Sequence, residues 1–290
     1  MIKRLFVLSA LALTLIPVHS QLLWKITGNG LKKPSYLFGT HHLISIQYLD
    51  SVPGLYKAFN ECDKVVGEIS TSNVDAATTI QAASIMPNGT MIDNLLTAEQ
   101  YNVVDKELKA VAKIGLKQVA MMNPTLILNI YEAEIFKKMT GFSDNNQSDS
   151  YLQLVAFEKG KAVEGLETVE EQINILYKIG TLKRQAELLY ETFLHKDSVL
   201  SDIKTLNTLY KQGNIEELYK LTLGTGKKHD FTEAELSNIL YQRNDKWATK
   251  LQSIMPSSSC FIAVGAAHLG GKRGVIKLLQ KQGFTVKPVQ

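Results

Sequence analysis

The sequence predicts a single α/β domain, with some α+β tendency: a mixed central sheet built from two related halves, with a helix-rich insertion in the middle. Short apolar runs typical of strands occur near both ends of the chain, whereas residues 97–254 carry mainly helical patterns. Two of these runs, YLFGTHHL (36–43) and FIAVGAAHL (261–269), end in the same Gly-x-x-His-Leu pattern. The chain has 290 residues, 45% of them hydrophobic, so it can bury a sizeable core. We therefore expect its two ends to complete one sheet.

The first twenty residues have the pattern of a signal peptide. Lys3 and Arg4 precede an apolar stretch that ends at Pro17, and Val18 and Ser20 suit the −3 and −1 positions of a cleavage site. The stretch is short for a bilayer, which favours cleavage over an uncleaved anchor. We therefore expect residues 1–20 to be removed and residues 21–290 to form an exported domain, periplasmic or secreted, without a stable membrane span.

The first part of the expected domain contains three strands and one helix. The segments LLWKIT (22–27) and SYLFGT (35–40) are separated by Gly and Pro turn signals, which predicts a hairpin. A helix is expected over 53–62. The next segment, KVVGEIS (64–70), is short and apolar enough to be a strand buried on both faces.

Capping residues and periodicity place the remaining elements. Thr97 with Gln100, and Thr232 with Glu235, make capping-box patterns that begin helices. The polar segment 140–150 is the best candidate for an exposed, mobile loop. The other expected helices cover 116–122, 124–139, 151–160, 169–195, 198–222, 235–254 and 274–282, and the other expected strands cover 161–167, 260–265 and 284–289.

The charge and cysteine content argue against nucleic-acid binding and against a catalytic cysteine. The formal net charge is +4, or about +2 without Lys3 and Arg4, and no dense basic run carries interleaved aromatic residues, so nucleic-acid binding is not expected. Cys62 and Cys260 each precede a strand-like run. If those strands are parallel neighbours, both thiols lie at one edge of the sheet, opposite the carboxyl ends. A disulfide and two free buried thiols both remain open, and neither cysteine has a catalytic context.

Polar side chains follow four of the expected strands. In open α/β sheets ligands bind beyond the carboxyl ends of the strands, where Gly39 and Gly265 would permit a sharp turn. The polar residues expected at that edge are His41, His42, Glu68, Glu167 and His268. Two histidines and one carboxylate are a common ligand set for a catalytic divalent metal. We predict His42, Glu68 and His268 as ligands, with His41 as a supplementary candidate.

Each of these residues also has a simpler interpretation. A single histidine at a strand end is more often a hydrogen-bonded structural residue, and no H-E-x-x-H or C-x-x-C motif is present. Glu68 could be a solvated strand end, and Arg243 with Asn244 could lie on a solvated helix face or stabilise an oxyanion. His195 and His229 are most simply surface residues. The repeated Gly-x-x-His-Leu context favours the metal interpretation for His42 and His268.

The ordered motifs YLFGTHHL, KVVGEIS, VEGLETVEEQ, YQRNDKWA and VGAAHLGGKRG resemble those of the TraB/GumN family. That family includes the TIKI metalloproteases and is distantly similar to erythromycin-esterase-like and ChaN-like proteins. The resemblance covers residues 22–289. It implies that His42 and His268 are the histidines of two GxxH motifs and that Glu68, Glu167 and the Arg243–Asn244 pair lie at the same site. His41 occupies a position that is usually apolar or small in the family, which leaves open that it supplements or replaces His42 as a ligand.

The resemblance implies a metal-dependent hydrolase that cleaves peptide or other amide bonds with Mn²⁺, Co²⁺ or Zn²⁺. In that reading Glu167 is the general base, Arg243 stabilises the oxyanion, and Asn244 orients a peptide or protein substrate. The alternative is a non-catalytic cell-envelope protein that binds metal or haem. A Ser-His-Asp hydrolase is disfavoured because no G-x-S-x-G motif is present.

Overall fold

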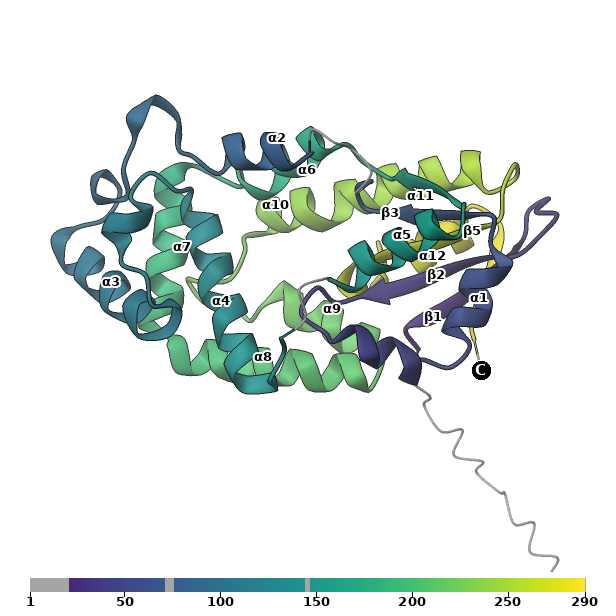
Figure 1. The fold of residues 1–290 in the computed structure, drawn as a ribbon, viewed down its shortest axis with the longest axis horizontal. Coiled ribbons are helices and arrows are strands. Elements are labelled where there is room, and N and C mark those ends of the chain that lie inside the picture. Colours follow the sequence, from purple (N-terminus) through teal and green to yellow (C-terminus); the bar gives the residue numbers. More distant parts are fainter. Residues whose placement is uncertain (1–20, 71–75, 144–146, 290) are drawn as a thin grey trace, which may run out of the picture.

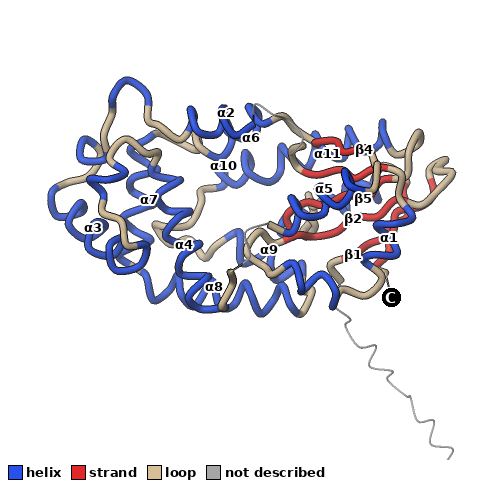
Figure 2. The backbone as a smooth tube through the Cα atoms, in the orientation of Figure 1, coloured by secondary structure: helices blue, strands red, loops and turns tan. Residues whose placement is uncertain are grey.

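A computed structural model describes residues 21–70, 76–143 and 147–289. The six strands gather at one end of the molecule and most of the helices at the other (Figures 1 and 2). The signal peptide predicted for residues 1–20 lies outside the described residues. Within them, no helix is long and apolar enough to cross a membrane.

The strands form one mixed sheet, which confirms the predicted fold class. Their order across the sheet is β4-β3-β5-β2-β1-β6. The four strands from β4 to β2 are parallel, and β1 runs antiparallel to both β2 and β6. Their bounds are β1 Leu23–Gly28, β2 Ser35–Thr40, β3 Lys64–Gly67, β4 Ala162–Gly165, β5 Cys260–Gly265 and β6 Phe284–Pro288.

The two strands that carry the repeated pattern are direct neighbours. Gly39 of β2 lies opposite Val264 of β5, and Thr40 lies opposite Gly265. Every residue of β2 is buried, because helices cover the sheet and β2 has a paired strand on each side. The two ends of the chain therefore meet at the centre of the sheet, as the repeated motif predicts.

Helices complete two hydrophobic cores. One core combines the sheet with residues of α1, α5, α11 and α12, and the other lies among α3, α4 and α7 in the helical half. The helix bounds are α1 Leu55–Glu61, α2 Ala76–Ala83, α3 Ala98–Ala112, α4 Pro124–Thr140, α5 Ser148–Glu158, α6 Val169–Leu176, α7 Leu182–Leu194, α8 Lys196–Lys211, α9 Ile215–Leu223, α10 Glu233–Leu236, α11 Gln242–Ile254 and α12 Val275–Lys281.

Both predicted capping boxes are confirmed. Thr97 accepts from the backbone N–H of Gln100 at 3.2 Å, and the Gln100 side chain accepts from the Thr97 backbone at 2.9 Å. The same reciprocal pair joins Thr232 and Glu235. These bonds satisfy backbone donors that have no partner inside the first helical turn.

The structure corrects three helix boundaries. The helices expected over 169–195 and 198–222 are each broken in two, because Gly180 and Gly213 adopt left-handed φ angles of +63° and +64°. The helix expected over 235–254 contains a π-helical turn at Ser237–Tyr241 between α10 and α11. Of the polar segment 140–150 that was expected to be a loop, Thr140 belongs to α4, α5 begins at Ser148, and residues 144–146 lie outside the described residues.

The two cysteines lie as their positions before parallel strands imply. Cys62 precedes β3, Cys260 begins β5, and both are buried free thiols in the structure. Burial raises the pKa of Cys62 to about 12 and that of Cys260 to about 11, which makes both poor nucleophiles. A disulfide and two free thiols were both left open by the sequence, and the structure has the free thiols.

A buried hydrogen bond ties the helical half to the sheet. The hydroxyl of Tyr210 in α8 donates to the carbonyl of Gly39 at 2.9 Å, inside the core. We expect Tyr210→Phe to lower the free energy of unfolding by about 1–2 kcal/mol, because the Gly39 carbonyl loses its side-chain donor. Urea denaturation measures this. Tyr101→Phe is the matched control, because the described residues offer its hydroxyl no hydrogen bond, and it should change stability by less than about 0.5 kcal/mol. Equal effects in both variants would contradict this role.

Candidate functional site

The carboxyl ends of β4, β3, β5 and β2 meet at one edge of the sheet and bring the predicted site residues together. Gly39 and Gly265 permit this. A Cβ on Gly39 would lie 3.1 Å from the Cα of Ala266, so the turns after β2 and β5 can pack against each other only if residue 39 lacks a side chain. A Cβ on Gly265 would lie 3.3 Å from Oε1 of Glu68.

Arg243 lies at the centre of this edge, buried between two carboxylates. Its Nη2 is 2.6 Å from Oε2 of Glu68 and 2.5 Å from Oε1 of Glu167, and its Nε donates to Oε2 of Glu167 at 3.1 Å. Its Nη1 donates to the carbonyl of Ile239 and lies 3.2 Å from Nε2 of His268. All five guanidinium hydrogens therefore have a protein acceptor.

Both carboxylate oxygens of Glu167 accept hydrogen bonds from several side chains. Besides the arginine, it accepts from the side-chain amide of Gln172 at 3.1 Å and from the indole N–H of Trp247 at 3.3 Å. Trp247 also stacks under the guanidinium of Arg243, at 4.6 Å from its ring centre. Because each oxygen of Glu167 already accepts two donors, this carboxylate is better suited to hold Arg243 than to take a proton from water.

Glu68 is ionised at neutral pH. Burial opposes the charge, but Arg243 outweighs that effect and lowers the pKa of Glu68 to about 2, with smaller contributions from His268 and His42. Its Oε1 accepts the backbone N–H of Gly265 at 2.8 Å, and its Oε2 also accepts from Gln172 at 3.1 Å. The low pKa leaves a carboxylate that can hold a cation.

Asn244 fixes the protonation state of His268. Its Oδ1 is 2.6 Å from Nδ1 of His268, while its Nδ2 donates to the carbonyl of Arg273 at 2.9 Å. An amide oxygen only accepts, so Nδ1 of His268 carries the proton and the electron pair of Nε2 accepts from Nη1 of Arg243. Burial, followed by the charges of Arg243 and His42, lowers the pKa of His268 to about 3, so the ring is neutral.

His42 is the most exposed of these residues, with about half of its side chain accessible. Its Nδ1 is 3.2 Å from Oδ1 of Asp149, in the first turn of α5. Local desolvation opposes protonation, but the hydrogen bond and charge of Asp149 raise the pKa of His42 to about 9. The charge of His42 also acts on Glu68 and His268, so His42 lies at the same edge of the sheet as these two residues.

His41 has different surroundings. Its ring centre lies 5.1 Å from that of Phe136 and 5.3 Å from that of Tyr210. Its Nδ1 accepts the backbone N–H of Leu43 at 3.1 Å, and its Nε2 is buried without a partner. Burial, with the charge of His42, lowers the pKa of His41 to about 4, so it is a neutral packed ring rather than a solvated one.

Of the two histidines that were expected to be surface residues, one is exposed and the other is buried. His195 is half exposed, as expected of a surface residue. His229 is not a surface residue, because its side chain is only 8% exposed and both ring nitrogens are buried. His229 lines a cavity in the helical half, and its position in a loop of the sequence did not indicate this burial.

The edge supplies the donor types that a divalent cation takes, but Arg243 already bonds to two of them, Glu68 and His268. His42 and His268 each have Nδ1 hydrogen-bonded to a side-chain oxygen, the pattern typical of metal-binding histidines, and Glu68 is ionised. Among the described residues, however, no three His, Cys, Asp or Glu side chains are arranged to hold a metal ion. A cation bound here would share Glu68 with Arg243.

Sequence reasoning missed three residues of the site: Asp149, Gln172 and Trp247. Trp247 lies four residues after Arg243, on the same helix face, so helical spacing could have identified it. Gln172 stands one turn beyond Thr168, which begins α6. Asp149 carried no signal, because the polar segment around it was expected to be a loop.

Comparisons with known proteins place the chain in a family. The profile described as the TraB/PrgY/gumN family matches residues 22–288. Metalloprotease TIKI2 of Danio rerio is 22% identical over 91% of the chain, and Metalloprotease TIKI1 of Homo sapiens is 22% identical over 93%. A Metalloprotease TIKI homolog of Amphimedon queenslandica is 23% identical over 91%. The chain spans about 60% of the length of these relatives, with 60%, 63% and 60% of each covered. No solved structure matches the chain significantly.

Removing the arginine tests its role in holding the carboxylates. We expect Arg243→Met to lower the free energy of unfolding by about 3–5 kcal/mol at pH 7, because Glu68 and Glu167 are left buried without a counter-charge. Denaturant unfolding at several pH values measures this. Arg273→Met removes an exposed ion pair with Asp245 and should cost less than about 1 kcal/mol.

The stability lost in Arg243→Met should decrease as the pH is lowered. In the wild type, Arg243 lowers the pKa of Glu68, so the stabilisation is present above the ordinary pKa and is lost as pH falls toward 2. In Arg243→Met, burial would raise that pKa, and protonation would relieve the buried charge. The difference between variant and wild type should shrink between pH 7 and about pH 4. A constant difference would contradict the assignment.

Proposed function

Because the chain belongs to the TraB/PrgY/gumN family, we propose that it is a metal-dependent hydrolase that cleaves peptide or other amide bonds. The observation that carries this proposal is the convergence of two imidazoles, each with a fixed Nδ1, beside the ionised Glu68. The metalloprotease names of the relatives support it.

His42, Glu68 and His268 are the residues that would hold Mn²⁺, Co²⁺ or Zn²⁺. A bound divalent cation polarises a carbonyl and lowers the pKa of its bound water. Asp149 and Asn244 orient the two imidazoles. This chain therefore places two imidazoles and one carboxylate at the edge. His42, whose pKa of about 9 keeps it protonated at neutral pH, would have to lose its proton to hold the cation.

The contacts revise the roles expected for three residues. Arg243 and Glu167 act as positioning residues in this proposal, because every donor of the arginine and both oxygens of the carboxylate are already bound. Asn244 fixes the tautomer of His268 rather than orienting substrate. The oxyanion role of Arg243 would require it to release one acceptor.

The second candidate is a non-catalytic cell-envelope protein that binds a metal or haem. The observation that favours it is that Arg243 and Glu167 already use all of their donors and acceptors, so neither is free to act as a donor or base in turnover. Such a protein would retain metal at the three residues without cleaving peptides. The two candidates therefore predict the same ligands and different activity.

Metal content tests the ligand set. After dialysis against each metal, we expect the wild type and His195→Ala to retain about one equivalent, and His42→Ala and His268→Ala to lose at least tenfold in affinity, because each loses a ligand. Elemental analysis and calorimetry measure this. Equal metal content in all four proteins would reject the ligand set.

Peptide cleavage then separates the two candidates. We expect a defined pool of peptides to be cut by the wild type with added metal and left intact with chelator, as followed by mass spectrometry. His195→Ala is the matched control and should cut the same bonds. Retained metal with an uncut pool at high enzyme concentration would leave the binding protein as the function.

We also propose that the protein is exported to the periplasm or the cell exterior. This rests on the charged and apolar pattern of residues 1–20. The intact mass of protein from envelope or medium should correspond to residues 21–290, with both Cys62 and Cys260 open to alkylation after denaturation. A mass that includes residues 1–20 would contradict cleavage, and two unreactive cysteines would show a disulfide.

A further inference from the structure

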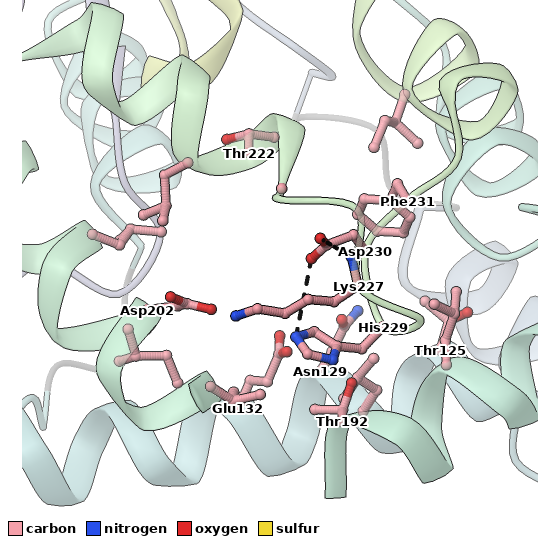
Figure 3. A pocket seen from close by; sticks show the side chains of 18 of the residues that line it. Thr125, Asn129, Glu132, Thr192, Asp202, Thr222, Lys227, His229, Asp230 and Phe231 are labelled. Atoms are coloured by element: carbon pink, nitrogen blue, oxygen red, sulfur yellow. Dashed lines mark hydrogen bonds and ion pairs between the residues drawn. The ribbon is translucent and has the colours of Figure 1, made fainter. Parts of the chain in front are cut away.

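A cavity of about 480 Å³ lies in the helical half of the molecule, outside the cluster around Arg243. Helices α4, α7, α8 and α9 surround it, together with the segment 224–231 that follows α9 (Figure 3). Much of its wall is apolar, formed by residues such as Leu128, Leu188, Val199, Ile203 and Leu206. This volume lies within the range of pockets that hold small organic ligands or a peptide side chain.

Unpaired polar atoms line the same cavity. Within the described part of the chain, both ring nitrogens of His229 are buried without a hydrogen bond, and Oδ1 of Asp230 is 4.0 Å from Nε2. Gln185 is 2% exposed; its Nε2 donates to the carbonyl of Tyr177, but none of the described residues offers a partner to its Oε1. Leaving such groups unpaired costs free energy unless a ligand satisfies them.

Glu132 adds an acceptor to this polar end. Its side chain points toward the cavity beside Asn129 and His229 (Figure 3). Among the described residues it makes no ion pair or hydrogen bond, and burial raises its pKa to about 7. The cavity therefore combines an apolar wall with acceptors for N–H groups, beside the charged side chains of Asp202 and Lys227 that also line it (Figure 3).

Two helices connect the cavity to the site at the sheet edge. Gln172 in α6 bonds to Glu68 and Glu167, and Leu176, four residues later on the same face, lines the cavity. Ile239 also lines the cavity, and its carbonyl accepts from Arg243, four residues later. Residues at this spacing are about 5–6 Å apart, so the cavity begins one helical turn from the site.

We propose that this cavity is the specificity pocket of the hydrolase, which receives an apolar side chain of the substrate while Gln185 and His229 bind its neighbouring amide groups. The proposal rests on the proposed function for the identity of the ligand as a substrate. It names the substrate class as peptides with a large apolar residue close to the cleaved bond.

Binding of a minimal probe tests the pocket without turnover. N-acetyl-phenylalanine-methylamide should bind the wild type in ligand-detected NMR, and N-acetyl-glycine-methylamide should bind at least about tenfold more weakly. Leu206→Trp fills the cavity from α8 and should weaken binding of the phenylalanine probe about tenfold or more. His229→Phe keeps an aromatic ring but removes both nitrogens, and it should also weaken binding of the phenylalanine probe. Circular dichroism confirms that each variant is folded.

Matched variants separate the pocket from other effects. Thr205→Trp adds the same side chain on an exposed position of α8 and should bind the probe as the wild type does. His42→Ala should also bind it normally while losing metal and cleavage, so failure of the hydrolase proposal and of the pocket proposal give different results. No binding to the wild type, or equal binding by Leu206→Trp, His229→Phe and Thr205→Trp, would overturn the pocket.

Discussion

The double ion pair of Arg243 is the interaction on which the site depends. One guanidinium from α11 holds a carboxylate that follows β3 and another that follows β4, and it also contacts the imidazole that follows β5. Three strands separated by up to 200 residues in sequence are thus fixed relative to one helix. Two buried carboxylates would repel each other without this cation, so Arg243 allows acidic residues to accumulate at a buried edge.

The histidines from the two chain ends differ because their partners differ. Asn244 is neutral and leaves His268 uncharged in a buried position, whereas Asp149 is acidic and favours a charged, accessible His42. The same motif therefore places one neutral, buried ring and one charged, accessible ring at the same edge of the sheet.

Much of the sheet could be predicted from sequence, because each strand is marked by a pattern within its own short segment. Each strand is a short apolar run bounded by Gly, Pro or a capping residue, and the repeated GxxH motif indicated that β2 and β5 share an edge. The helical half was less predictable, because Gly180 and Gly213 break helices whose apolar periodicity continues across them. The partners of Glu167 and the burial of His229 depend on contacts between distant segments, which no local pattern encodes.

The π-helical turn at Ser237–Tyr241 sets the direction in which Arg243 points. A π turn accommodates one more residue than an α turn, so the chain after it is rotated by about 100° relative to a regular helix. Deletion of one residue between the Thr232 cap and Arg243 would convert the π turn to a regular α turn. The guanidinium would then point away from Glu68 and Glu167. Insertions and deletions, rather than substitutions, are therefore the changes that this segment is least able to accept.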